Sequence, residues 1–355
     1  MFVKTNLAVY SAKAYDKAHF EDAIELATDD FHKSLNITFH TFALSMETVA
    51  LAKGADAVCV FVNDLLSKDI LQALHAIGVR GILLRCAGYN NVDLVAAEEL
   101  NMFVANVPAY SPEAVAEFAV ALLQTLNRKT HRAFNRVRDG NFDLQGFVGH
   151  TLYGKTVGIV GVGRIGLSFA RIMKGFGCTV FAYDPYGGDA FLEYGSYIKE
   201  LKDLLPKCDV VSLHCPLTEG TLHLINDDTL KYMKPGALLI NTSRGALIDT
   251  TAAISALKSK ILGGLALDVY EAEAELFYMD HSGEIIHDDE LMRLTTFPNV
   301  LICGHQAFLT FEALTEIAQV TLGNFEDFIH KRQCKNSLVR EGLVLVRRDT
   351  APVRS

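Results

Sequence analysis

The sequence lacks an excess of positive charge and has no long hydrophobic run. Its 355 residues include 33 Lys and Arg against 42 Asp and Glu, which gives a formal net charge of −9. Nucleic acids and anionic membranes bind basic faces, so we expect neither as a partner. No segment reaches the roughly 18 consecutive apolar residues of a membrane-spanning helix. The N-terminal stretch turns acidic before a signal-peptide core can form, so we expect no secretion. A small anionic substrate remains compatible with this composition.

The cysteines form no CxxC pair. There are seven, an odd number, and they are scattered along the chain: Cys59, Cys86, Cys178, Cys208, Cys215, Cys303 and Cys334. Several lie in apolar, strand-like runs, where a free cysteine behaves as a small hydrophobic residue. This usage indicates a cytoplasmic protein in a reducing compartment, with no disulfide framework, and we expect no metal site.

Proline is also scarce, at 8 residues against 26 glycines, which suits helices and strands joined by short turns. Short β-branched runs alternate with segments of helical period, a pattern typical of parallel sheets covered by helices. The first series of strands is predicted at 7–12, 36–40, 56–61, 81–88 and 102–107. The second is predicted at 155–163, 178–184, 209–215, 236–243, 263–269 and 299–305. Two such series predict an α/β protein with two similar lobes.

Helix signals separate and follow the two series. Ser111 precedes Pro112, which suits the first helical position, and the Ala-rich segment that follows predicts one long helix over about 111–139 that links the lobes. Gly140 is its predicted stop. A second long helix is predicted over about 310–330, followed by a loosely ordered tail, VRRDTAPVRS.

The strongest local signal is the run Gly161-Val162-Gly163-Arg164-Ile165-Gly166. A glycine-rich turn alone is weak, but this one follows an apolar strand and opens an apolar-periodic helix, as a dinucleotide-binding turn does. Gly161 permits the tight turn, Gly163 lets the backbone approach a pyrophosphate, and Gly166 permits close helix–strand packing. The next predicted strand ends at Asp184, whose carboxylate suits the ribose hydroxyls of NAD and repels the 2′-phosphate of NADP.

Three later strands end in polar residues, where α/β sheets bind ligands. Arg244 could hold a carboxylate with its planar fork. Glu273 follows the strand that ends at Asp268, but Glu271 and Glu275 are competing carboxylates. His305 suits acid–base chemistry because the ordinary pKa of histidine lies near neutrality. His214 is its rival, and its place within a strand favours a cofactor-facing or core role.

Together these residues resemble the D-2-hydroxyacid dehydrogenase family, most closely its fermentative D-lactate dehydrogenases. The resemblance covers about residues 1–335 and lies in GVGRIG with Asp184, HCPLTEGTLHLIN, MKPGALLINTSRGALID, LALDVYEAE and GHQAFLT, in family order. It implies a flavodoxin-like substrate lobe and a Rossmann-like NAD-binding lobe, both doubly wound, with an active-site cleft between them. The substrate domain would be discontinuous, over 1–109 and 310–340, the NAD-binding domain would cover 110–309, and 341–355 would form a tail.

The resemblance also implies the catalytic roles. Arg244 would bind the substrate carboxylate and carbonyl, and His305 would give or take the proton. The family's acidic residue lies five positions after the strand-end Asp268, which selects Glu273 as the partner of His305.

Cofactor and substrate contacts follow from the same resemblance. The implied cofactor residues are Gly161, Gly163, Arg164, Ile165, Gly166, Asp184, Cys215, Pro216, Thr242, Ser243 and Asp268. Besides Arg244 and His305, the implied substrate residues are Ala87, Gly88, Tyr110 and Phe308, with Phe61 nearby.

Pyruvate and D-lactate are the expected substrates, because Tyr110 and Phe308 would shrink the pocket to suit a methyl group. The alternatives are reduction of another 2-keto acid, such as hydroxypyruvate or a branched one, and an NAD(H)-sensing binding protein that resembles dehydrogenase-like co-repressors. The family implies a homodimer or a homotetramer.

Overall fold

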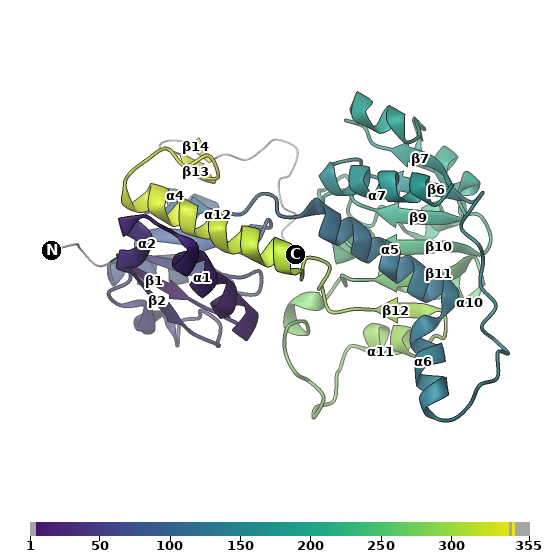
Figure 1. The fold of residues 1–355 in the computed structure, drawn as a ribbon, viewed down its shortest axis with the longest axis horizontal. Coiled ribbons are helices and arrows are strands. Elements are labelled where there is room, and N and C mark those ends of the chain that lie inside the picture. Colours follow the sequence, from purple (N-terminus) through teal and green to yellow (C-terminus); the bar gives the residue numbers. More distant parts are fainter. Residues whose placement is uncertain (1–4, 341–342, 345–355) are drawn as a thin grey trace. The chain divides into compact units, whose positions relative to one another are not determined.

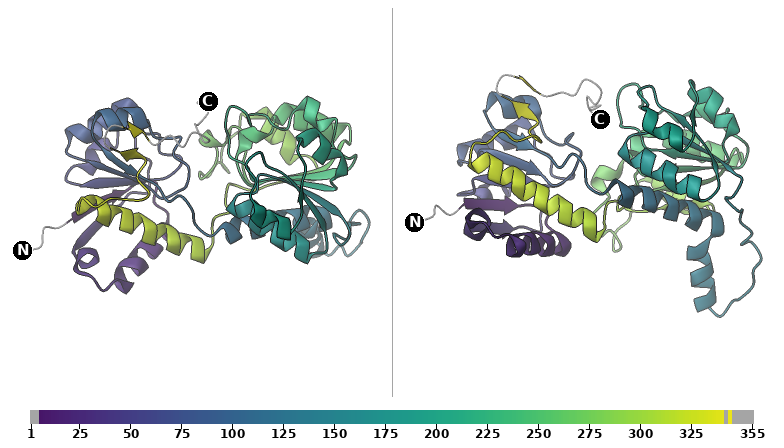
Figure 2. Two further views of the ribbon diagram at one scale, coloured as in Figure 1. Left: turned by 90° about the horizontal axis from the view of Figure 1, so that it is seen from above. Right: turned by 45° about the horizontal axis from the view of Figure 1, so that its top comes forward.

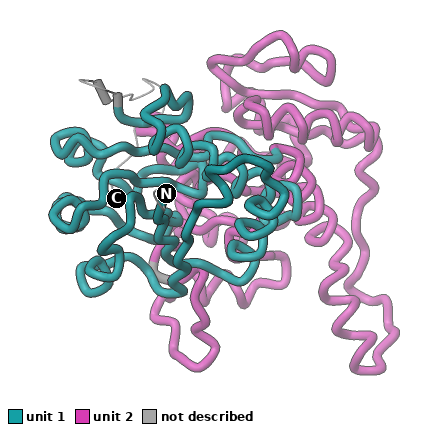
Figure 3. Tube along the Cα trace, turned by 60° about the vertical axis from the view of Figure 1, so that its left-hand side comes forward, with its two compact units in different colours: residues 1–111, 309–355 teal, residues 112–308 magenta. Residues whose placement is uncertain are grey.

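The chain folds into two compact units, each built around its own parallel β-sheet. The computed structural model, drawn in Figure 1 and from two further directions in Figure 2, describes residues 5–340 and 343–344. Unit 1 comprises Met1–Ser111 and Leu309–Ser355, and unit 2 comprises Pro112–Phe308 (Figure 3). Unit 1 is discontinuous, because the chain returns to it after completing unit 2.

Unit 1 contains a five-stranded parallel sheet with the strand order β2-β1-β3-β4-β5, which is that of flavodoxin-like doubly wound sheets. Its strands are β1 (Thr5–Val9), β2 (Leu35–Phe39), β3 (Ala57–Val60), β4 (Gly81–Leu84) and β5 (Phe103–Ala105). The connections contain α1 (Ala14–Leu26), α2 (Asp30–Ser34), the 3-10 helix η1 (Val49–Ala52), α3 (Lys68–Ala76) and α4 (Leu94–Glu99). The returning chain adds α12 (Phe311–Ile329) and the hairpin β13 (Val339–Arg340) and β14 (Leu343–Val344).

One face of this sheet is covered by α1, α2 and α12. Leu7, Cys59 and Leu83 of the strands pack with Phe20 of α1 and Phe325 of α12 in one apolar cluster. In Figure 1, α12 lies beside α1, against which it packs. The last long helix of the chain is therefore part of the core of the first lobe.

Unit 2 contains a seven-stranded parallel sheet with the order β12-β11-β10-β9-β6-β7-β8. The strands are β6 (Thr156–Val160), β7 (Thr179–Tyr183), β8 (Ser196–Tyr197), β9 (Val210–Leu213), β10 (Ala237–Asn241), β11 (Leu262–Leu267) and β12 (Val300–Ile302). The α-helices are α5 (Pro112–Arg128), α6 (Thr130–Arg138), α7 (Arg164–Gly175), α8 (Leu201–Leu204), α9 (Asp227–Leu230), α10 (Thr250–Lys258) and α11 (Asp289–Thr295). The 3-10 helices are η2 (Asp189–Glu193), η3 (Leu205–Lys207), η4 (Gly245–Leu247) and η5 (Glu273–Glu275). The strand order reverses at β6, which is the switch point where Rossmann sheets bind ligands.

Helices cover both faces of the unit 2 sheet, as its apolar strands require. On one face α5 and α7 pack against a cluster that includes Ile159 and Ile240, and on the other α10 packs against a cluster that includes Leu239 and Leu265. Adjacent residues of one strand, Leu239 and Ile240, thus belong to opposite faces, which is the alternation of a β-strand. The predicted α/β class with two doubly wound, Rossmann-type lobes is confirmed.

The prediction of one long helix over 111–139 is wrong. The segment forms α5 and α6, separated at Lys129, whose φ of 53° is left-handed. The side chain of Asn127 near the end of α5 donates to His150 O and accepts from His150 N, both at 2.8 Å. These bonds come from a residue distant in the sequence, so local helix propensity over 111–139 does not reveal the break. Gly140, with a φ of 73°, follows the end of α6 as predicted.

Among residues 5–340 and 343–344, no helix is long and apolar enough to cross a membrane. All seven cysteines are free, and Cys303 alone among them is not fully buried. The predicted tail VRRDTAPVRS lies outside the described residues.

Candidate active site

The glycine-rich turn joins β6 to α7 at the switch point of unit 2. Gly161 has a φ of 91°, and a Cβ on it would lie 2.6 Å from Cys215 N. A Cβ on Gly166 would collide with the carbonyl oxygen of Gly161, whereas a Cβ on Gly163 would meet nothing within 4 Å. Gly163 is also the N-cap of the twelve-residue helix α7. The turn therefore packs tightly against neighbouring backbone at Gly161 and Gly166 but leaves space at Gly163, at the N-terminus of α7. There the free N–H groups and the helix dipole favour a phosphate.

Asp184 follows β7 beside this turn. Its Oδ2 accepts from Val162 N at 2.7 Å, and its Oδ1 accepts from Tyr186 N at 2.8 Å. The carboxylate is thus fixed at the carboxyl end of the strand next to β6, where dinucleotide folds bind a ribose. Arg164 and Ile165 form the first turn of α7. The open cradle and the oriented carboxylate fit a dinucleotide.

Arg244 lies in a turn that follows β10 and is ordered by buried Asn241. Asn241 Nδ2 donates to Arg244 O at 2.8 Å, and Asn241 Oδ1 accepts from Ser243 N at 3.0 Å. The guanidinium of Arg244 donates through Nη1 to Ser243 O at 2.7 Å. It makes no ion pair with a carboxylate of the described residues, so the chain presents a half-buried cation without a counter-charge.

His305 follows β12 and pairs with Glu273. His305 Nδ1 lies 2.8 Å from Glu273 Oε1, and both side chains are about one-fifth exposed, at 21% and 23%. Glu273 Oε2 accepts from Tyr270 N at 2.8 Å, so the carboxylate is held by its own loop. Because a carboxylate accepts hydrogen bonds, Nδ1 carries the hydrogen, which leaves Nε2 to act on a ligand.

Asp268 holds the backbone of the His305 segment. It is fully buried, and its carboxylate accepts from Gln306 N at 2.9 Å and Ala307 N at 2.8 Å, while its carbonyl accepts from His305 N at 2.7 Å. Burial raises the pKa of this carboxyl, an effect that the two backbone donors oppose. His305 itself has a left-handed φ of 53°. The predicted role of Asp268 in cofactor binding stays a prediction; its visible contacts position His305.

The remaining predicted cofactor residues surround the ends of β9 and β10. Ser243 Oγ donates to Cys215 O at 2.7 Å, and Pro216 O accepts from Thr221 Oγ1 at 2.7 Å. Thr242 Oγ1 is buried and has no hydrogen-bond partner among the described residues. Burial raises the pKa of the Cys215 thiol to about 12, so this cysteine is neutral at physiological pH.

The two rival candidates have other partners. Nε2 of His214 lies 2.9 Å from Ser212 Oγ, and burial lowers the pKa of the imidazole to about 3, so the ring is uncharged near neutrality and is not the general acid. Glu271 contacts the Nε2 atom of His223 with Oε1 and accepts from Thr250 Oγ1 with Oε2 at 2.9 Å. The structure therefore pairs Glu273, and not Glu271, with His305.

In unit 1, Ala87 and Gly88 lie in the turn after β4. Ala87 O accepts from Asn106 Nδ2 at 2.8 Å, and Gly88 O accepts from Cys86 Sγ at 3.3 Å. Tyr110 lies after β5, just before unit 1 gives way to unit 2. The turn is thus hydrogen-bonded to Asn106, which directly follows β5, and to its own first residue, Cys86.

A buried arginine, Arg85, directly precedes this turn and connects it to neighbouring strands, a role that the sequence did not reveal. Arg85 is 2% exposed; its Nε donates to Asp16 Oδ1 at 3.2 Å, and its Nη1 and Nη2 donate to Tyr10 O and Ser11 O at 2.9 and 2.8 Å. The guanidinium also lies 4.8 Å from the ring centre of Phe61. Arg85 thereby joins the ends of β1, β3 and β4 directly before the turn.

Phe308 closes unit 2 three residues after His305 and is buried. Tyr278 is a neighbour of His305 that the sequence reading did not single out. Its hydroxyl donates to His305 O at 3.3 Å, and the two ring centres lie 6.0 Å apart. It lies in the insertion after Glu273, where no pattern marks one aromatic residue above another.

Among the described residues, no group of three or more His, Cys, Asp or Glu side chains could hold a metal ion. The functional groups of unit 2 instead follow β6, β7, β10, β11 and β12 at the carboxyl edge of one Rossmann sheet. Such an edge, with a phosphate cradle and a carboxylate-paired histidine, defines a nicotinamide-dependent dehydrogenase.

The comparisons with known proteins give the family. The profile of the D-isomer specific 2-hydroxyacid dehydrogenase NAD-binding domain matches residues 120–307. The 2-hydroxyacid dehydrogenase A of Aspergillus oryzae is 68% identical over 349 residues, which are 98% of this chain and 99% of that protein. The D-lactate dehydrogenase of Escherichia coli is 50% identical over 333 residues, 94% of this chain and 99% of that protein. The chain belongs to the D-2-hydroxyacid dehydrogenase family and is an NAD(H)-dependent oxidoreductase close to the D-lactate dehydrogenases.

Solved structures agree. The apo-structure of Escherichia coli D-lactate dehydrogenase has a TM-score of 0.86 at 48% identity and covers 94% of this chain and 100% of that chain. The pyruvate reductase of Chlamydomonas reinhardtii has a TM-score of 0.88 at 41% identity and covers 94% of this chain and 98% of that chain.

Proposed function

We propose that this protein catalyses the reversible reduction of pyruvate to D-lactate with NADH. The observation that carries the proposal is the Glu273–His305 pair at 2.8 Å, which lies on the same sheet edge as Arg244. Relatives named D-lactate dehydrogenase, from Curvularia clavata at 61% identity and from Escherichia coli at 50%, favour lactate over bulkier hydroxy acids.

The cofactor proposed is NAD rather than NADP. The N-terminus of α7 would bind the diphosphate, and Asp184 would accept hydrogen bonds from the ribose hydroxyls and repel a 2′-phosphate. When bound, the nicotinamide supplies the hydride that reduces the carbonyl carbon of the substrate.

Arg244 and His305 would act on the substrate itself. The planar guanidinium can hold the carboxylate through two hydrogen bonds and fix the neighbouring carbonyl. His305, protonated at Nε2 and oriented by Glu273, would donate that proton to the carbonyl oxygen as negative charge develops there, and would take it back in the reverse reaction. Both cations stabilise the transition state more than the ground state, because the charge on the oxygen grows during the reaction.

The side-chain pocket is a separate part of the proposal. Ala87 and Gly88 would offer backbone N–H groups to the carboxylate, and Tyr110 and Phe308 would limit the substrate side chain to about a methyl group. Replacement of Phe308 by Ala should therefore raise kcat/KM for a branched 2-keto acid relative to pyruvate.

The exposed apolar surface of α6 and the following segment supports assembly into a homo-oligomer. α6 buries none of its residues, and Phe134, Phe142, Leu144 and Val148 are 62%, 74%, 79% and 84% exposed. Arg136 fixes the segment by donating to Asp143 O and Gln145 O, and Figure 1 draws α6 extending from the sheet of unit 2. A patch of this kind marks a protein interface, and we propose a second copy of the chain as its partner. Phe142→Asp with Leu144→Asp should yield a smaller species in sedimentation.

The test of the reaction is NADH oxidation by the purified protein with pyruvate, followed by enantiomer-specific analysis of the lactate. D-lactate alone is expected. The His305→Gln variant should lose at least ~10² in kcat, the scale of general acid catalysis. Turnover of hydroxypyruvate or a branched 2-keto acid but not pyruvate would replace the substrate. Tight NADH binding with no turnover of any 2-keto acid would favour the sensor alternative.

A further inference from the structure

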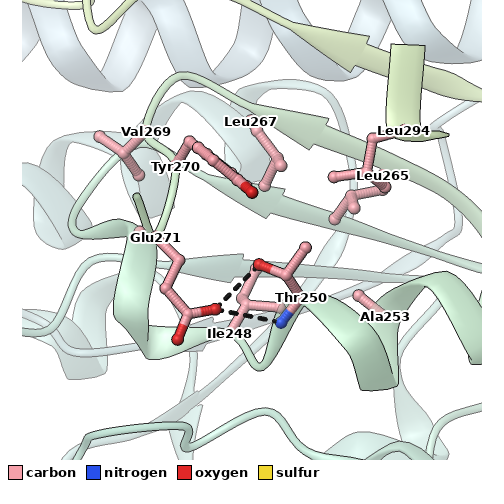
Figure 4. Close-up of a pocket in the computed structure, with 10 residues that line it drawn as sticks. Ile248, Thr250, Ala253, Leu265, Leu267, Val269, Tyr270, Glu271 and Leu294 are labelled. Atoms are coloured by element: carbon pink, nitrogen blue, oxygen red, sulfur yellow. Dashed lines mark hydrogen bonds between the residues drawn. The ribbon is translucent and has the colours of Figure 1, made fainter. Parts of the chain in front are cut away.

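The loop after β11 carries a second carboxylate–imidazole pair that the reaction does not use. Glu273 reaches His305, but Glu271, two residues earlier, contacts the Nε2 atom of His223. The other oxygen of Glu271 accepts from Thr250 Oγ1 at 2.9 Å and from Thr250 N at 3.3 Å (Figure 4). Thr250 is the first residue of α10, so the negative charge of Glu271 also lies favourably at a helix N-terminus.

His223 belongs to a segment that runs beside the residues just after Arg244. His223 N donates to Ala246 O at 2.8 Å, Ile225 N donates to Leu247 O at 3.0 Å, and Asp249 N donates to Ile225 O at 2.9 Å. The backbone φ of His223 is 48°, a left-handed value that costs a non-glycine residue about 1 kcal/mol or more. The strain is maintained by this ladder and by the bond from Asn226 Nδ2 to His223 O at 2.9 Å.

The backbone of the Arg244 turn also packs closely against the loop that contains Glu271. A Cβ on Gly245 would lie 2.0 Å from the carbonyl carbon of Tyr270 and 2.4 Å from Glu271 N. Gly245 and Glu271 line a cavity of about 10 Å³, roughly the space of one water, whose other walls include Leu265, Leu267 and Leu294 (Figure 4). Thr250, which donates to the Glu271 carboxylate, also lines this cavity.

We propose that His223 and Glu271 are positioning residues that set the place of the Arg244 guanidinium relative to the Glu273–His305 pair. The pair joins the segment after β9 to the loop after β11, and the Arg244 turn after β10 lies between these two in the strand order. His223 and Glu271 thus hold the substrate anchor from both sides, while Glu273 holds the acid. This inference rests on the proposed function, in which Arg244 binds the substrate carboxylate.

The test separates substrate anchoring from cofactor binding and from folding. His223→Ala and Glu271→Ala should each raise KM for pyruvate about tenfold, change kcat less, and leave the Kd for NADH, measured by fluorescence, within about twofold of wild type. His223→Gln, which can still hydrogen-bond Glu271, should recover most of the lost affinity. The two single variants should not add in the double variant, because they break one interaction.

A matched control uses another histidine–carboxylate pair, His32 with Asp29 in unit 1, in which His32 Nδ1 lies 2.8 Å from Asp29 Oδ2. His32→Ala should leave all three parameters unchanged. An unchanged KM for pyruvate in folded His223→Ala and Glu271→Ala proteins would overturn the inference. So would equal losses of pyruvate and NADH affinity, which would indicate a general structural role. If the wild-type protein reduced no 2-keto acid, the proposed function would fail first, and the inference would fall with it.

Discussion

Replacement of Gly245 by alanine should damage catalysis without unfolding the protein. The φ of Gly245 lies outside the left-handed region, so the argument depends on space alone. The new Cβ would lie 2.0 Å from the carbonyl carbon of Tyr270, and ordinary contacts begin at 3.4 Å, so the two segments must separate by about 1.4 Å. Both neighbours are backbone atoms, which cannot turn away as a flexible side chain can.

This separation would move Arg244, the proposed substrate anchor, relative to the Glu273–His305 pair. Gly245 follows Arg244 directly, and Tyr270 N is the donor that holds Glu273 Oε2. A misplacement of about 1 Å costs on the order of 10²-fold in rate, so kcat/KM for pyruvate should fall by at least this factor, or about 2.7 kcal/mol in transition-state stabilisation. Affinity for NADH should stay near wild type, because the glycine-rich turn and Asp184 follow β6 and β7 at a different part of the sheet.

The assay is steady-state NADH oxidation, with NADH binding and thermal unfolding measured on the same samples. Gly175→Ala is the matched control, because its Cβ would meet nothing within 4 Å and it lies in α7, where alanine is the better helix former. A folded Gly245→Ala protein with wild-type kcat/KM would refute the reasoning.

Three further outcomes are expected. Glu273→Gln should lower kcat for pyruvate reduction by about tenfold or more, since it removes the carboxylate 2.8 Å from His305 that orients the imidazole; a wild-type kcat would exclude Glu273 as its partner. Asp184→Ser should raise KM for NADH by tens of fold, the loss of about 2 kcal/mol from a charged acceptor, and shift preference toward NADPH, as the ratio of kcat/KM values would measure. His214→Gln should flatten the pH dependence of stability in urea unfolding. The folded pKa of His214, about 3, is below its unfolded value of 6.5, so its contribution is complete above pH 6.5 and falls by about 1.4 kcal/mol per unit as the pH drops toward 3; equal slopes would contradict this.

The sequence predicted every long strand because the strand pattern is local. All eleven predicted strand regions contain a strand, since β-branched runs bounded by turns persist whatever surrounds them. The missed strands have two residues each: β8 joins the sheet by pairing with β7, and β13 and β14 pair with each other in a hairpin. The missed break at Lys129 depends on the bonds of Asn127 to His150, and such tertiary contacts have no signature in the helix itself.

The site was predicted unevenly for the same reason. Gly161 and Gly166 of the dinucleotide turn have a local cause, a positive φ or a close approach, so the glycine spacing between a predicted strand and a predicted helix identifies the turn. Arg85 has no such local signal. Its structural role depends on hydrogen bonds to Asp16, Tyr10 and Ser11, which lie about 70 residues earlier in the chain. From the sequence it is one charged residue at a strand end, as Arg244 is. Burial separates them, with Arg85 enclosed and Arg244 half-exposed.

The different partners of Glu271 and Glu273 show that the strand order carries information that residue type and position do not. In the sheet, β11 lies between β12 and β10, with β9 beyond β10. A loop after β11 can therefore extend one carboxylate to the segment after β12 and another across the β10 turn to the segment after β9. Glu273 takes the first direction, to His305, and Glu271 takes the second, to His223. Without the family resemblance, residue type and position leave the two glutamates nearly equivalent, and the neighbours of the strand then distinguish the partner of His305 from the partner of His223.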